Sequence, residues 1–314
     1  MLLTLSVFTA LIIDFIVGEP RRWHPLVGFG NVANWLEGKL NKVGNKSPFM
    51  SRTSGLIGWA LLVLPFSILL ICVMREGLAA EVEFVISVVC LTFAIGTKSL
   101  TQHAKAVVDA LKNSDIVLAR KKIAMIVSRD TSTSDERAIN TATIESVLEN
   151  GSDAIFAAIF WFVVLGAPGV VLYRLANTLD AMWGYRTERF NSFGWAAARI
   201  DDVLNWLPAR LTALSYALAG NARSALLCWK SQARNWHGVN PGVVMATGAG
   251  ALNIKLGGAA TYHGAMVERP ALGCCNAPQV TDIGRAIRLV VKSIFIWVLM
   301  IALVEYLLGE YFFV

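Results

Sequence analysis

Charged residues are scarce in this sequence: they make up 16% of its 314 residues, whereas 55% are hydrophobic. In a typical soluble domain about a quarter of the residues are charged. The composition therefore excludes an ordinary soluble enzyme and indicates an integral membrane protein. The remaining charges are grouped in blocks, which leaves polar loops large enough for chemistry. The net charge of +6 suits loops close to anionic lipid, and it equally suits an anionic ligand such as a nucleotide.

Motifs that identify many soluble enzymes are missing. The sequence contains no G-x-x-x-x-G-K-[ST] or G-x-G-x-x-G phosphate loop, no G-x-S-x-G elbow and no H-E-x-x-H pair. Its five cysteines form no C-x-x-C pair, so we expect them to pack rather than to bind zinc or form disulfides. The glycine-rich stretch 246–258 favours close helix packing, with a phosphate-binding loop as the alternative. No feature supports a role in nucleic-acid binding.

Long apolar runs mark the membrane. The stretches 55–74 and 289–308 are long and apolar enough to span a bilayer, and 1–17 and 83–100 are shorter candidates. The N-terminal stretch 1–17 lacks a basic leader and a small-residue cleavage site, so we expect it to be retained rather than removed as a signal peptide. We therefore predict an all-α integral membrane protein, residues 1–314 forming a single membrane-embedded domain. It would have four to five transmembrane helices, re-entrant or amphipathic helices and a helical cytoplasmic portion.

The loops predict the orientation. Six Lys or Arg residues lie in 18–53, eight in 97–153 and seven in 221–288, whereas the turn 75–82 has one. The positive-inside rule places the loops rich in Lys and Arg in the cytoplasm. We expect a multi-pass protein of the cell inner membrane, with the N-terminus and the turn 75–82 outside. The expected cytoplasmic segments are 18–53, 97–153, 175–202 and 221–288.

The segment 154–174 has two interpretations. Its apolar residues could just cross a bilayer, but Pro168-Gly169 interrupts the helix about two thirds of the way along. The segment 203–220 is a poor span, because it contains Pro208 and Arg210. We favour a segment that dips into the membrane and returns, and such backbone is tolerated only where protein buries it or it lines a cavity. A re-entrant segment would therefore itself indicate a site.

The polar helix that precedes this segment carries acids in register. Glu145, Glu149 and Asp153 follow one another at intervals of four residues, so one helical stripe presents three carboxylates. Like charges at this spacing repel each other. They form either a solvated face or a site for a cation such as Mg²⁺, which binds one or two carboxylates together with substrate phosphates. Upstream, the spacing of Thr133 and Glu136 predicts a capping box at the start of this helix.

A second set of polar residues follows the apolar segment. Asn177 and Asp180 share a helix face, and Asp201-Asp202 precede the next apolar stretch. If the apolar segment dips into the membrane and returns, these residues face the acids of the preceding helix across one cytoplasmic opening. Nearby arginines would supply positive charge there. Independent surface residues are the alternative. The arginines are Arg186, Arg189 and Arg199.

Near the N-terminus, Asp14 lies in the last turn of the first apolar stretch, followed by Glu19 and two prolines. An acid inside a span is costly enough to be a functional candidate. Snorkelling of the carboxylate to the interface is the alternative. His24 precedes a proline and is more easily explained as structural.

Taken in order, the motifs "DFIVGEP…HP", "SRDTS", "ESVLENGSDAIFA", "GAPG…YRLANTLDAMWGYRTERF", "ARIDDVLNWLPARL" and "AGALNIKLGG" resemble the CobD/CbiB family of adenosylcobinamide-phosphate synthases. The resemblance runs from about residue 11 to residue 290. The chain departs from the family pattern at Gly151 and Ala154, where relatives usually carry Thr and Gly. It also has "GVN" in place of Ser-Pro-Asn, which keeps only Asn240.

The resemblance implies an enzyme that attaches aminopropanol, or its O-phosphate, to adenosylcobyric acid in amide linkage. ATP and Mg²⁺ would take part, and the protein would contact membrane lipid. A carboxylate is a poor electrophile, so ATP would first convert it to an acyl phosphate, whose negative charge needs neutralising. A transporter of a corrinoid or other small molecule, and a non-catalytic membrane regulator on the same scaffold, are the alternatives. A homo-oligomer is also left open.

Residue roles follow from this chemistry. We assign Glu145, Asp153 and Asp180 as candidate metal ligands. Asp14 or Glu19 would accept the amine proton as general base.

A second group of residues is assigned to contacts with the ATP phosphates and with the substrate. Arg129, with Asp130, would lie at the phosphates, and Asn150 and Asn177 would orient the substrate. Residues assigned to binding the co-substrate are Arg186, Arg189 and Asn240.

Overall fold

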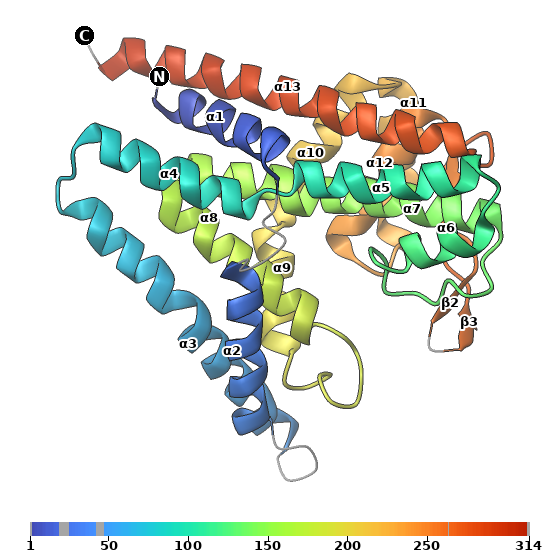
Figure 1. Cartoon of the computed structure of the whole chain (residues 1–314), viewed down its shortest axis with the longest axis horizontal. Coiled ribbons are helices and arrows are strands. Elements are labelled where there is room, and N and C mark those ends of the chain that lie inside the picture. The colour runs from blue at the N-terminus through green and yellow to red at the C-terminus, as the bar shows by residue number, and fades with distance from the viewer. Residues whose placement is uncertain (1, 19–24, 42–46, 263, 313–314) are drawn as a thin grey trace. The chain divides into compact units, whose positions relative to one another are not determined.

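The computed structural model describes residues 2–18, 25–41, 47–262 and 264–312 (Figure 1). It is 77% helical. The helices are α1 Leu2–Ile16, α2 Pro25–Leu40, α3 Pro48–Arg75, α4 Ala80–Ala94, α5 Thr97–Lys112, α6 Ile116–Ile123, α7 Glu136–Gly151, α8 Ala157–Trp183, α9 Trp195–Leu204, α10 Trp206–Ala219, α11 Ala222–Gln232, α12 Val239–Leu252 and α13 Val280–Phe312. A π-helical turn, Ser152–Phe156, joins α7 to α8, and a 3₁₀ turn, Ala233–Asn235, follows α11. The strands are β1 Lys255–Leu256, β2 Ala260–Tyr262, β3 Ala265–Val267 and β4 Leu272–Gly273.

The chain divides into two compact units. Unit 1 consists of Met1–Gly96 and Ala157–Asn205, and unit 2 of Thr97–Phe156 and Trp206–Val314. The single membrane-embedded domain expected from the sequence stays a prediction.

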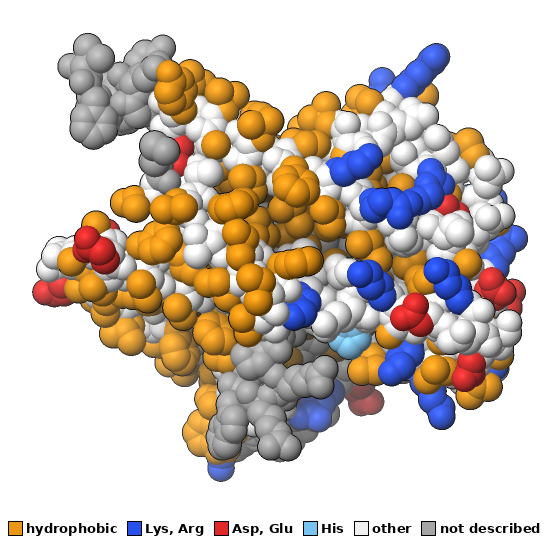
Figure 2. Space-filling view, turned by 45° about the horizontal axis from the view of Figure 1, so that its top comes forward, with side chains coloured by type: hydrophobic (Ala, Val, Ile, Leu, Met, Phe, Trp, Pro, Cys, Tyr) orange, Lys and Arg blue, Asp and Glu red, His pale blue; other side chains and the backbone are white. Residues whose placement is uncertain are grey.

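Within the described residues, four helical stretches are long and apolar enough to cross a membrane: Pro48–Arg75, Ala80–Lys112, Glu136–Trp183 and Val280–Leu307. The predicted spans 55–74 and 83–100 lie within the first two of them, and 289–308 overlaps the last up to Leu307. The helix α1 is apolar but shorter. Hydrophobic side chains of α3 and α13, such as Leu69 and Leu299, are exposed, and Figure 2 shows how widely such side chains are exposed on one face of the molecule. These findings confirm an all-α integral membrane protein.

Unit 1 is built around the apolar faces of α2, α3, α8 and α9. Its core includes Trp59, Leu179 and Trp183, with Phe193 packed edge-on against the Trp183 ring at a centroid distance of 5.0 Å. Gly55 of α3 lies so close to the Phe193 carbonyl that any Cβ would overlap it. The long apolar helix α3 is therefore held tightly against the loop before α9.

The helix α8 contains the break expected at Pro168. Gly166 has a φ of 65°, which lies outside the helical region and suits glycine. A Cβ on Gly169 would overlap the carbonyl oxygen of Trp161, two helical turns earlier. The helix is therefore sharply bent at Gly166. Whether the segment crosses the bilayer or dips into it and returns stays a prediction, as does the side of the membrane on which it opens.

Unit 2 packs α5, α6, α7 and α10 to α13 together. The helix α13 lies along α5 and α7, and α12 lies between α10 and α11 (Figure 1). A Cβ on Gly250 of α12 would overlap the backbone of Ala225, and one on Gly248 would overlap the Leu148 side chain. Neither position therefore has room for a larger residue. This confirms close helix packing for the first half of the glycine-rich stretch. The pairs β1–β4 and β2–β3 form small antiparallel sheets that were not expected in a helical cytoplasmic portion.

Candidate functional site

The helix α7 places Glu145 in the interior of unit 2. The helix begins at Glu136, and the carboxylate of Asp135 caps it by accepting the Ala138 N–H at 2.7 Å. The predicted capping box was wrong on this point, because Asp135 and not Thr133 is the N-cap. Nine residues further on, Glu145 is buried, with 3% of its surface exposed. A buried carboxylate is stable as the anion only when it is paired and hydrogen-bonded.

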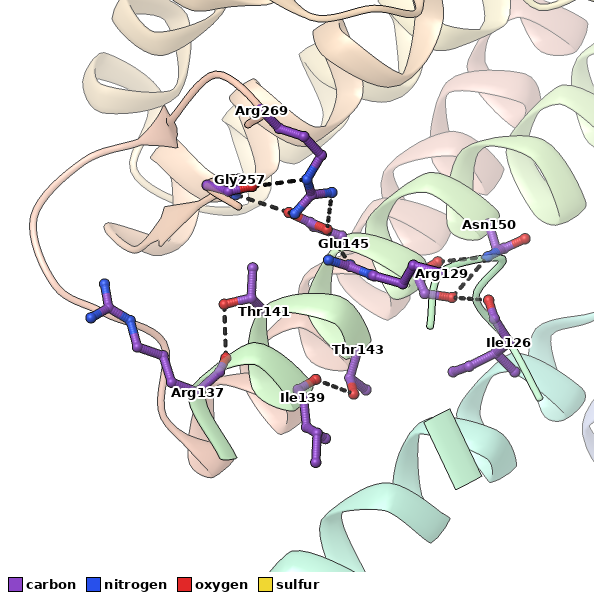
Figure 3. A network of polar contacts seen from close by, with 12 residues as sticks. Ile126, Arg129, Arg137, Ile139, Thr141, Thr143, Glu145, Asn150, Gly257 and Arg269 are labelled. Atoms are coloured by element: carbon purple, nitrogen blue, oxygen red, sulfur yellow. Dashed lines mark hydrogen bonds and ion pairs between the residues drawn. The ribbon is translucent and has the colours of Figure 1, made fainter. Parts of the chain in front are cut away.

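Three donors converge on Glu145 (Figure 3). Arg129 forms an ion pair with its Oε2 atom. Arg269 donates from Nη1 to Oε2 at 3.1 Å and from Nη2 to Oε1 at 3.3 Å. The backbone N–H of Gly257 donates to Oε1 at 2.9 Å. The two guanidinium groups are themselves buried, with 10% and 6% of the side chains exposed. We call Arg129, Glu145 and Arg269 the arginine–glutamate cluster.

The loop 255–273 presents Arg269 to this cluster. Gly257 has a φ of 79°, and a Cβ there would overlap the Pro270 carbonyl, so the position requires glycine. Arg269 donates from Nε to the Gly258 carbonyl at 3.0 Å, and its guanidinium lies 5.2 Å from the Trp236 ring centroid. The second half of the glycine-rich stretch thus turns its backbone N–H toward a carboxylate.

A second loop presents Arg129. The neighbouring Asp130 donates its backbone N–H to the Thr261 carbonyl at 2.9 Å, which ties the loop to strand β2. The Asp130 carboxylate accepts the Ser132 N–H at 2.9 Å, and this hydrogen bond lowers the pKa of Asp130. Arg129 therefore contacts the cluster directly, whereas Asp130 shapes the loop that carries it.

Asn150 lies five residues after Glu145 and is linked to the loop of Arg129 through Ser146. Its Nδ2 atom donates to the carbonyl and the hydroxyl of Ser146, and that hydroxyl donates to the Ile126 carbonyl at 3.1 Å. Glu149 is close enough for its charge to interact with those of Glu145, Arg129 and Arg269. The acidic stripe thus has Glu145 and Glu149 near two arginines, and the solvated-face interpretation does not apply to Glu145.

Asp153 lies in the π-helical turn that follows α7. Such turns are rare and are frequent at functional sites. The Tyr216 hydroxyl donates to the Leu148 carbonyl at 3.0 Å, and burial together with the charge of Asp153 raises the pKa of Tyr216. A Cβ on Gly151 would lie 2.7 Å from the Tyr216 Oη atom. Position 151 therefore has little room for a side chain larger than that of glycine.

Unit 1 holds a separate polar cluster on α8 and α9. Asp201 is 9% exposed and accepts from Asn177 at 3.2 Å and from Asn205 at 2.9 Å. The Tyr173 hydroxyl donates to the Asn205 amide oxygen at 2.9 Å. Burial raises the pKa of Asp201 to about 6, although the two amide donors oppose the shift. Asn177 is therefore a partner of Asp201, which was singled out in the sequence but not assigned a role.

Two candidate arginines of unit 1, Arg186 and Arg189, differ in their contacts. Arg189 forms an ion pair with Glu37 of α2, Nε to Oε1 at 3.0 Å, whereas Arg186 is exposed. Burial tends to raise the pKa of Glu37, but hydrogen bonds from Arg189 and Asn41 outweigh it and lower the pKa. Arg189 thus fastens the loop after α8 to α2. Its role in binding a co-substrate stays a prediction.

The remaining candidates are scattered between the units. Asp14 is buried in α1, and Asp180 lies on α8 in unit 1, where its carbonyl accepts the Gly184 N–H. Asn240 is buried at the start of α12 in unit 2 and accepts from Arg210 at 2.7 Å. Glu19 and His24 lie outside the described residues. The expectation that both polar sets meet at one cytoplasmic opening stays a prediction.

The donors around Glu145 do not favour a directly bound metal ion. Its oxygens already accept from two guanidinium groups and one N–H, and a cation there would be repelled by both arginines. Across the described part of the chain, no group of three or more His, Cys, Asp or Glu side chains is arranged to hold a metal ion. Among the three candidate ligands, Glu145 therefore has the least support from the structure.

All five cysteines lie in the described part of the chain and are free thiols. Cys274 approaches Ser224 Oγ at 3.1 Å and Cys275 Sγ at 3.2 Å.

Comparison with known proteins places the chain in a family. The model of the CobD/Cbib protein family matches residues 7–290. The chain is 53% identical over 290 residues to the cobalamin biosynthesis protein CobD of Chromobacterium violaceum, covering 92% of each chain. It is 52% identical over 297 residues to the protein of that name from Stutzerimonas stutzeri, covering 95% of this chain and 96% of the other. No solved structure matches it. The chain therefore belongs to the CobD/CbiB family.

Proposed function

We propose that this protein acts in cobalamin biosynthesis as an ATP-dependent ligase. It would join aminopropanol, or its O-phosphate, to a propionate carboxylate of adenosylcobyric acid. Relatives that carry the name cobalamin biosynthesis protein, at more than half identity over nearly the whole chain, support the pathway. The observation that carries the chemistry is the arginine–glutamate cluster, in which two buried guanidinium groups are held at fixed positions by one carboxylate.

The cluster suits the step that is hardest for such a reaction. Transfer of the γ-phosphoryl group to a carboxylate brings two anions together, and positive groups must offset their repulsion. Arg129 and Arg269 each have further N–H donors beyond those that reach Glu145, because a guanidinium carries five. Glu145 would keep both groups oriented before the substrate arrives. Preorganised donors of this kind need no rearrangement as charge develops.

The amine must lose a proton when it attacks the acyl phosphate. Asp14 and Glu19 remain our proposed bases, and Asn150 and Asn177 remain proposed substrate contacts. Asn150 is anchored to Ser146, so its amide oxygen has a defined direction near the cluster. Mg²⁺ would accompany ATP and offset the charge of its phosphates. Since Mg²⁺ binds largely through phosphates and water, one or two protein carboxylates suffice, and Asp153 is the candidate in unit 2.

The membrane helices support catalysis at a membrane rather than in solution. We propose that the polar loops face the cytoplasm and that the N-terminus lies outside, in agreement with the positive-inside rule. A transporter would instead carry its polar residues along a path through the membrane. In the arginine–glutamate cluster one carboxylate holds two guanidinium groups in place, which favours a fixed catalytic scaffold over a permeation path.

The experiment uses the full chain in detergent or nanodiscs with adenosylcobyric acid, ATP and Mg²⁺. Aminopropanol and its O-phosphate are supplied in separate reactions, and mass spectrometry follows the amide product while a coupled assay follows ADP. We expect amide formation that depends on ATP, with one amine preferred. Corrinoid uptake into proteoliposomes without amide formation would contradict the ligase and support the transporter.

A further inference from the structure

Unit 2 contains an open pocket that shares one residue with the surroundings of the arginine–glutamate cluster, because its lining residue Trp236 also lies against Arg269. It has a volume of about 680 Å³ and is formed by α10, α11, the 3₁₀ turn and the start of α12. Two kinds of side chain dominate its lining: nitrogen-bearing groups that are positive or can become so, and indole rings. They are Arg210, Lys230, Arg234, His237, Trp229 and Trp236.

The charge of this pocket has one sign. No Asp or Glu is among its lining residues, within the described part of the chain. Over the same residues, Lys230, Arg234 and His237 form no ion pair with an acid. These three side chains are exposed, and together with Arg210 they give the pocket a positive potential that attracts anions. The pocket therefore selects for a negatively charged ligand.

Arg210 is held in place at the pocket wall. Its Nη1 atom donates to the Trp206 carbonyl and to the Asn240 Oδ1 atom, both at 2.7 Å. Its guanidinium also lies 4.5 Å from the centroid of the Trp206 ring. All these partners are neutral, so the positive charge of Arg210 is not cancelled by them. A fixed guanidinium with donors to spare suits a phosphate, which it can bind through two parallel hydrogen bonds.

The start of α12 adds to the positive potential. Val239, its first residue, lines the pocket, and the N-cap residue Gly238 provides no side-chain hydrogen bond. A helix N-terminus carries partial positive charge and unsatisfied N–H groups, which favour phosphate binding. The helix has 14 residues, so its dipole is well developed. The N-terminus of α12 therefore favours a phosphate, as the basic side chains do, and its contribution does not depend on theirs.

We propose that this pocket binds a phosphate-bearing ligand, its phosphate held by Arg210, Lys230 and Arg234 and its remaining part lying against Trp229 and Trp236. Two sources share this chemistry: a soluble phosphorylated compound, and the headgroup of an anionic phospholipid. Assigning the soluble compound to ATP or to the phosphorylated amine rests on the proposed function. The preference for phosphate rests on the pocket alone.

The test compares two variants that each remove two positive charges. Lys230→Gln with Arg234→Gln alters the pocket, and Lys105→Gln with Lys121→Gln alters exposed lysines of the same unit. Calorimetry on the full chain in nanodiscs of neutral lipid measures the Kd for ATP and for inorganic phosphate. Native mass spectrometry measures retention of phosphatidylglycerol. Each lost charge-assisted contact should weaken binding about tenfold.

The outcomes separate the sources. Binding of ATP or phosphate that only the pocket variant weakens supports a soluble ligand, and phosphatidylglycerol retention that only the pocket variant loses supports a lipid. Equal binding by both variants and the unaltered protein, or binding of none of the probes, overturns the proposal. Amide formation is measured on the same samples. Pocket-dependent phosphate binding without any amide product would refute the proposed function and leave this inference standing.

Discussion

The arginine–glutamate cluster makes a quantitative prediction about stability. Glu145→Gln keeps an oxygen that can accept the Gly257 N–H, but it removes the negative charge that faces Arg129 and Arg269. Both guanidinium groups are at most 10% exposed, so water cannot replace the lost partner. Removing one member of a buried ion pair costs about 3–5 kcal/mol. We expect the free energy of unfolding to fall by this amount.

Unfolding of the full chain in mixed micelles, followed by circular dichroism, measures the change. Glu136→Gln is the matched control, because Glu136 begins the same helix and is exposed. It should cost less than about 1 kcal/mol, the value of a favourable charge in the first turn of a helix. Adding Arg269→Gln to Glu145→Gln should cost less than the sum of the two single changes, because the residues interact. Equal losses for Glu145→Gln and Glu136→Gln would refute the cluster as a stabilising unit.

Three further predictions concern other contacts. Gly151→Thr should lower the free energy of unfolding by about 1–3 kcal/mol, since its Cβ would crowd the Tyr216 hydroxyl, and thermal denaturation checks this. The pKa of Asp201 is raised to about 6 in the folded protein, so folding favours the protonated carboxyl group. The free energy of unfolding should therefore fall by about 3 kcal/mol as the pH rises from about 4 to above 6. Asp201→Asn should remove this fall. The pKa of Glu37 is lowered, so its contribution is present at neutral pH and is lost on acidification. Arg189→Gln should destabilise the protein at neutral pH, and it should do so less once acidification protonates Glu37; denaturation at neutral and acidic pH measures both effects.

Much of the fold follows from the sequence because hydropathy is a local property. The spans in α3 and α13 are continuous apolar runs. A break at Pro168-Gly169 can be read from residue types alone, whereas the structure places the non-helical residue at Gly166. The small β-pairs were not anticipated, since strands of two or three residues leave no periodic pattern. Thr133 was taken for the cap because its spacing to Glu136 matches a capping box, whereas the structure uses Asp135.

The candidate site was predictable only in part. The four-residue spacing of acids identified Glu145, and Arg129 was assigned beside a phosphate. Arg269 was missed, because it lies 124 positions from its partner and no motif surrounds it. Its one local signal is its place as a charged residue just before a proline in a glycine-rich region. Which long-range partner a carboxylate finds is decided by packing, and spacing along one helix carries no information about it.

The central claim is that the two buried guanidinium groups belong to the site of amide formation. The measurement that tests it most directly is the rate of ATP-dependent amide formation by Arg269→Lys, compared with Arg137→Lys, which alters an exposed arginine on α7. Lysine keeps the charge but loses the paired hydrogen bonds of the guanidinium. We predict a fall in kcat of about 100-fold for Arg269→Lys, in the range for loss of one preorganised donor, and no change for Arg137→Lys. Equal rates for a folded Arg269→Lys variant and the unaltered protein would contradict the account.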